Sequence, residues 1–127
     1  MTTSPGDVAM ARALERGELP DGGFHHADHL RVAWVYLDEY GGADAAFTAM
    51  AQTLRRFAAS VGTPEKYSDA LTAFWIYQLA SARALLPGAD VDAVFRACPR
   101  LLDKNLLLVF TEADVASPRS ADPSRDA

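Results

Sequence analysis

The chain has one cysteine, few β-branched residues and no long apolar run, and each shortage excludes a class of protein. Cys98 alone cannot form an internal disulfide. The most apolar stretch, residues 101–110, is interrupted by Asp103, Lys104 and Asn105, so it falls short of the roughly 20 residues that a membrane span requires. The opening residues MTTSP lack the basic start and apolar run of a signal peptide. We therefore expect a reduced, cytoplasmic protein that is not integral to a membrane.

The sequence also has no excess of positively charged residues. The sequence has 12 Lys and Arg against 17 Asp and Glu, for a formal net charge of -5. Such a chain is repelled by phosphate backbones. The densest basic spots, Arg55 with Arg56 and Arg96 with Arg100, are too small for a binding stripe and are typical of solvated helix sides. We expect neither a nucleic-acid partner nor a membrane partner.

What is abundant is Ala and Leu at helical spacing, which predicts an all-α fold. Apolar periodicity, with Gly, Pro and Asp at the ends, predicts helices over 7–16, 26–40, 43–60, 67–86, 91–97 and 101–110. Helices joined by short turns form a bundle. We therefore expect a single-domain bundle of about five or six helices over residues 1–116. The composition of residues 117–127 predicts a disordered tail.

All three histidines lie in residues 24–34, which read FHHADHLRVAW. On a helix, His26 and His29 are three positions apart and His25 and His29 four, spacings that place two imidazoles within reach of one ion or one proton. A metal needs further ligands, and Asp28 points partly away from the pair. The alternative is structural. Asp28 then stabilises the positive helix end, His25 is exposed, and His26 and His29 are hydrogen-bonded at the edge of the core.

A second group of polar residues lies where the 67–86 helix begins. Ser68, Thr72 and Trp75 share one helical face, so two hydroxyls would stand at the rim of an apolar stripe and could line a pocket. The alternative is again structural: Ser68 caps the helix, Thr72 bonds back to a backbone carbonyl and Trp75 belongs to the core.

Together these segments resemble a family of small, uncharacterised bacterial proteins. Its aromatic-x-His-x-x-His-Leu motif corresponds to residues 24–30, with its histidines at His26 and His29, and its Tyr-His-x-Thr-x-Thr motif corresponds to residues 67–72. In the second motif Tyr67 and Thr72 match, whereas Ser68 replaces histidine and Ala70 replaces the first threonine. The acidic and aromatic C-terminal motif of that family is replaced by the Ser/Pro/Asp tail. The resemblance implies no established activity, and the Ser68 departure removes one ligand from any three-histidine metal site.

Three hypotheses follow, and the first is favoured. In it, a small molecule binds in a pocket where His26 and His29 act as general acid or base and Tyr67, Ser68 and Thr72 orient it. Trp34 or Trp75 would supply an apolar wall. The second hypothesis is a transition-metal protein with His25, His26 and His29 as candidate ligands, which Ser68 weakens. The third is a non-catalytic interaction module, which packs through Leu106, Leu107 and Leu108 on a partner or, as a homodimer, on its own copy. The residues specify neither a substrate nor a reaction.

Overall fold

The computed structural model describes residues 3–20 and 22–105, and within these ranges the chain is all-helical. Its five α-helices are α1 (Pro5–Glu15), α2 (His26–Tyr40), α3 (Ala43–Ser60), α4 (Asp69–Leu85) and α5 (Val91–Ala97). Two short 3-10 helices, η1 (Pro64–Lys66) and η2 (Pro99–Leu102), precede α4 and follow α5. The predicted all-α class is confirmed. Within the described ranges, we find no helix with the length and apolar character needed to cross a bilayer.

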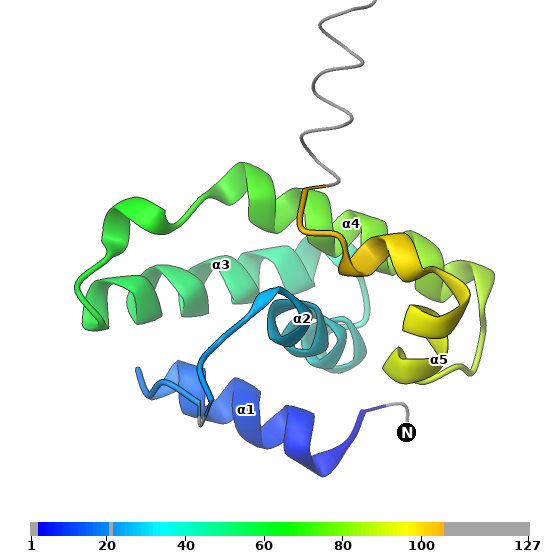
Figure 1. Cartoon of the computed structure of the whole chain (residues 1–127), viewed down its shortest axis with the longest axis horizontal. Helices are drawn as coiled ribbons and strands as arrows, with labels where there is room; N and C mark the ends of the chain where they lie inside the picture. Colours follow the sequence, from blue (N-terminus) through cyan, green and yellow to red (C-terminus); the bar gives the residue numbers. More distant parts are fainter. Residues whose placement is uncertain (1–2, 21, 106–127) are drawn as a thin grey trace, which may run out of the picture.

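The central element is α2, which is seen almost end-on in the middle of Figure 1 with the other helices around it. All side chains from residue 32 to residue 37 are buried, so this stretch is covered on every side. A helix that is apolar all round is stable only when neighbouring elements enclose it. Here α1, α3 and α4 pack directly against it, and the ion pair between Arg31 and Asp92 connects it to α5.

Local signals in the sequence set the helix ends. The Ser68 side chain accepts a hydrogen bond from the Leu71 amide and so caps α4, which is why α4 begins at Asp69 and not at the predicted residue 67. The Asp90 carboxylate accepts in the same way from the Ala93 amide and caps α5. At the end of α2, Gly41 adopts a left-handed conformation with φ of 78°, which costs glycine little because it has no Cβ.

The predicted helix over residues 101–110 is wrong in its described part. After α5 the chain forms only the short helix η2, which ends at Leu102. The Asp103 carboxylate then accepts a hydrogen bond from the Asn105 amide, a local turn that competes with helix continuation. Leu101 is buried and Leu102 is exposed. The tail at 117–127 and the leucines at 106–108 lie outside the described residues.

Candidate functional site

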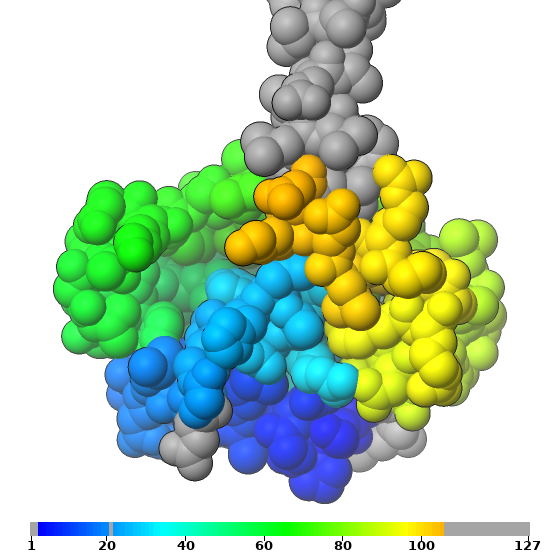
Figure 2. Space-filling model, viewed as in Figure 1, coloured from blue at the N-terminus to red at the C-terminus, as the bar shows by residue number. Residues whose placement is uncertain are grey.

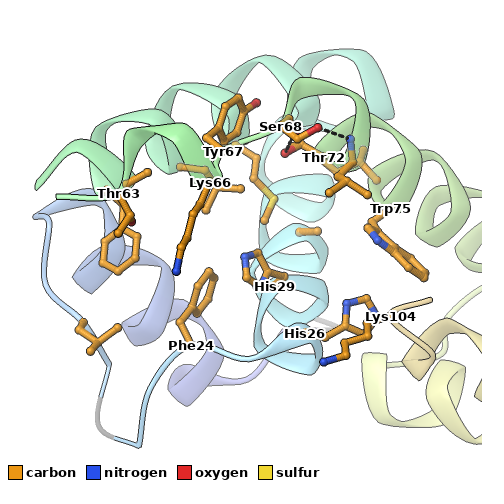
Figure 3. Close-up of a pocket in the computed structure, with 18 residues that line it drawn as sticks. Phe24, His26, His29, Thr63, Lys66, Tyr67, Ser68, Thr72, Trp75 and Lys104 are labelled. Carbon is orange, nitrogen blue, oxygen red and sulfur yellow. Dashed lines mark hydrogen bonds between the residues drawn. The ribbon is translucent and has the colours of Figure 1, made fainter. Parts of the chain in front are cut away.

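A pocket of about 620 Å³ lies beside α2, between α3 and α4. Its volume falls within the range of about 300–1,000 Å³ that small-molecule sites occupy. The apolar lining residues are Leu19, Phe24, Ala33, Met50, Leu54, Phe57, Ala58, Leu71, Trp75 and Ile76. The remaining lining residues are His26, His29, Thr63, Lys66, Tyr67, Ser68, Thr72 and Lys104. Figure 3 shows how the labelled side chains surround this space.

The structure brings together the two segments that the sequence singled out. Every residue predicted for the site lines this one pocket except Trp34 and His25, the latter a candidate metal ligand only. The start of α2 contributes the histidines, and the start of α4 contributes Tyr67, Ser68, Thr72 and Trp75. The chain around Lys104 lies against the beginning of α2 (Figure 2). Lys104 therefore lines the pocket next to the histidines. Two stretches about forty residues apart in the sequence therefore form one hollow.

Trp34 does not belong to the pocket. It is only 1% exposed, and its ring packs under the Arg83 guanidinium at 4.8 Å. Five residues along a helix turn a side chain by roughly 140°, so Trp34 points away from the direction of His29. Trp75, the other tryptophan considered for the wall, is half-buried and does line the pocket.

His26 is held by two contacts. Its Nε2 lies 2.8 Å from the Leu101 carbonyl oxygen, and a carbonyl can only accept, so Nε2 carries the hydrogen and donates. The imidazole also packs edge-on against the Trp75 ring, with centroids 4.5 Å apart. These contacts join α2 to η2 and α4. His26 therefore holds this edge of the pocket together, and in the neutral ring its Nδ1 carries no hydrogen.

His29 is held differently. Its Nδ1 lies 3.0 Å from the His25 carbonyl oxygen, so in the neutral ring Nδ1 carries the hydrogen and Nε2 has a free lone pair. Its ring lies against Phe24, with centroids 4.0 Å apart. Burial lowers the pKa of His29, and the hydrogen bond to the His25 backbone opposes that shift only in part. The result is a neutral imidazole with one defined basic nitrogen.

This burial predicts a pH dependence of stability. Unfolded His29 titrates at about pH 6.5, and its pKa in the folded chain is lower. Between the two values the unfolded chain binds more protons, so the free energy of unfolding decreases as the pH falls below about 6.5 and levels off below the folded pKa. Thermal melts between pH 7.5 and 5 should show a shallower decrease in His29→Gln than in the wild type.

The comparison variant for that measurement is His25→Gln, which removes a neighbouring imidazole that is 74% exposed and keeps the backbone carbonyl that binds His29. A His29→Gln slope equal to that of the wild type would show that His29 is not responsible.

The Tyr67 hydroxyl is directed away from the pocket (Figure 3). It donates to the Asp69 carboxylate at 2.6 Å, and Arg55 binds the two oxygens of that carboxylate at 2.7 and 2.8 Å. Burial and the bond to Asp69 raise the pKa of Tyr67. The ring lines the pocket, whereas the hydroxyl belongs to a surface network. Because this hydroxyl binds Asp69, the structure gives no support for its predicted role in orienting a ligand.

The hydroxyls of Ser68 and Thr72 bind the backbone at the start of α4. Ser68 Oγ accepts from the Leu71 amide at 3.2 Å, and Thr72 Oγ1 donates to the Ser68 carbonyl at 2.9 Å. Both bonds match the structural alternative stated from the sequence. They fix the edge of α4 that faces the pocket, so these two residues shape the wall and use their hydroxyls for that purpose.

The three histidines point to three different partners. His25 is exposed and pairs with the Asp28 carboxylate at 3.5 Å, and Asp28 also accepts the His25 amide at 2.9 Å. Residues 3–20 and 22–105 contain no group of three or more His, Cys, Asp or Glu side chains placed to hold a metal ion. The metal hypothesis based on His25, His26 and His29 therefore gains no support from the geometry.

Sequence reasoning missed several lining residues. Phe24 entered only as part of the histidine motif, and Phe57 was not predicted for the site. Lys66 and Lys104 were not predicted for the site, although they are the only lysines in the sequence. That rarity was the one available signal, because nothing local places them on a shared pocket.

Comparisons with protein-family models, curated proteins and solved structures give no match. The resemblance described from the sequence therefore depends on its motifs alone.

Proposed function

We propose that this chain binds a small organic molecule in the pocket between α3 and α4, with His29 as its proton acceptor. The observation that carries the proposal is an apolar pocket of about 620 Å³ that contains an imidazole with a fixed tautomer. A concave apolar site with a few placed polar groups is the usual form of a ligand site.

The chemistry expected of His29 follows from its two nitrogens. Nδ1 is occupied by the His25 carbonyl, so only Nε2 can accept a proton or a hydrogen bond from a ligand. The lowered pKa keeps this nitrogen unprotonated throughout the neutral range, as a general base requires. The ring contact with Phe24 limits its rotation. We therefore assign acid–base work to His29, whereas the His26 ring is packed between the Leu101 carbonyl and Trp75.

The walls supply affinity and orientation. Phe24 packs edge-on against Phe57, with centroids 6.0 Å apart, and Trp75 packs edge-on against Phe74 at 5.0 Å. Aromatic walls of this kind bury flat or branched apolar groups effectively. We therefore expect a ligand with a substantial apolar body.

The proposal is tested by a nuclear magnetic resonance screen of about a hundred small molecules against the labelled chain. The two tryptophan indole N–H signals provide an internal control. Binding in the pocket should shift the Trp75 signal and the amides of Phe24 and His29, and should leave the Trp34 signal in place. A panel in which no compound shifts the pocket signals, or in which shifts gather elsewhere, would contradict the proposal.

A further inference from the structure

Both lysines of the chain lie at this one pocket. Lys66 ends η1, in the connection between α3 and α4, and Lys104 follows η2, so they come from separate segments. Each lines the pocket. In Figure 3 the amino group of Lys66 is directed toward Phe24 and His29, and that of Lys104 lies beside His26. Two exposed lysines thus lie at the edge of a largely apolar pocket.

The charge around the pocket is unlike that of the rest of the chain. None of the described lining residues is acidic, although acidic residues outnumber basic ones in the sequence. The arginines in ion pairs with carboxylates are Arg12, Arg16, Arg31, Arg55 and Arg83. Neither lysine has such a partner among residues 3–20 and 22–105. The two lysines are therefore available for a negative charge that comes from outside the described part of the chain.

We infer that the ligand of this pocket is an amphipathic carboxylate: its apolar body lies against the aromatic walls and its carboxylate is held by Lys66 and Lys104. This inference rests on the proposed function and specifies its ligand class. The body is enclosed by Phe24, Phe57 and Trp75, which offer no charged partner. An ammonium on a long flexible stem can reach an anion at the rim, and the absence of a lining carboxylate removes competition for it.

The neutral state of His29 fits this arrangement. A positive charge on His29 would compete with the two lysines for the carboxylate, whereas burial keeps the His29 imidazole uncharged by lowering its pKa. The carboxylate then stays at the rim with the lysines. The part of the ligand next to the His29 Nε2 is its body, so any proton that His29 accepts comes from there.

The test compares two probes that differ only in charge, 2-naphthylacetate and 2-naphthylacetamide. Dissociation constants are measured by chemical-shift titration at pH 7.5 in low salt. We expect the carboxylate to bind about tenfold more tightly than the amide, a difference of about 1.4 kcal/mol. In Lys66→Met/Lys104→Met this preference should fall below threefold, and in the wild type 0.5 M sodium chloride should reduce it.

The matched control is Arg56→Met/Arg96→Met, which removes two exposed positive charges outside the pocket and gives the same net charge. It should keep the full preference for the carboxylate. Equal binding of the two probes to the wild type would overturn the inference and leave the proposed function standing. An equal loss of preference in both double variants would also overturn it, because net charge would then be the cause. Failure of both probes to bind at 2 mM would overturn the inference as well. The proposed function is decided separately, by the wider screen.

Discussion

Replacing Trp34 with alanine should lower the free energy of unfolding by about 3–5 kcal/mol, the range for truncating a large buried aromatic side chain. Trp34 is 1% exposed in the middle of the central helix, so its removal leaves a cavity that α1, α3 and α4 cannot easily close. It also removes the ring on which Arg83 packs. A domain of this size has a total stability of about 5–15 kcal/mol, so the loss is a large share. Urea denaturation followed by circular dichroism measures it.

The comparison variant is Trp75→Ala, at the half-buried tryptophan of the pocket wall. It should cost less stability than Trp34→Ala and should weaken ligand binding, because it removes the wall beside His26. Trp34→Phe retains part of the packing and serves if the alanine variant does not fold. Equal losses of stability at the two tryptophans would contradict the assignment of Trp34 to the core and Trp75 to the wall.

Filling the pocket from α3 should abolish binding of any ligand found in the screen. Ala58 is buried and lines the pocket, so the indole of Ala58→Trp would extend into space that the folded chain leaves empty. We expect affinity to fall at least about a hundredfold, or about 2.7 kcal/mol. Stability should change little, because the new side chain displaces no core residue. Titration of the wild type and the variant with the same compound measures the change.

Ala59→Trp is the matched control, since Ala59 is the next residue and faces solvent. The same side chain placed there should leave affinity within about twofold of the wild type. If Ala58→Trp bound the compound as the wild type does, the compound would lie elsewhere, and the pocket would lose its assigned role.

The helices could be predicted because their signals are local. The ends of α2 follow from the histidine segment and Gly41, and α5 follows from Asp90, each within a few residues of the boundary. Caps and turns depend on hydrogen bonds between near neighbours, so the sequence specifies them directly. The helix predicted over 101–110 was wrong within residues 101–105, because the apolar pattern was given more weight than a local signal, the Asp103 turn to Asn105.

The candidate site could be predicted only in part. Grouping His26, His29, Tyr67, Ser68, Thr72 and Trp75 was correct in that all line one pocket. Their chemical availability was not predictable, because it depends on partners such as the Leu101 carbonyl for His26, which is 75 residues distant in the sequence. For Trp34, helix periodicity already indicates a direction roughly 140° from that of His29, and its packing under Arg83 agrees with that direction.

The sequence by itself determined that the chain is all-helical, where most helices begin and end, and that three imidazoles gather at the start of α2. Those properties depend on short-range backbone bonding and on side-chain periodicity. Only the tertiary structure decided which ring nitrogens of His26 and His29 bind backbone carbonyls, and that two lysines distant in the sequence line the same pocket. Both outcomes depend on which segments the central helix α2 brings together, and hydrophobic packing between helices is a property of the whole chain.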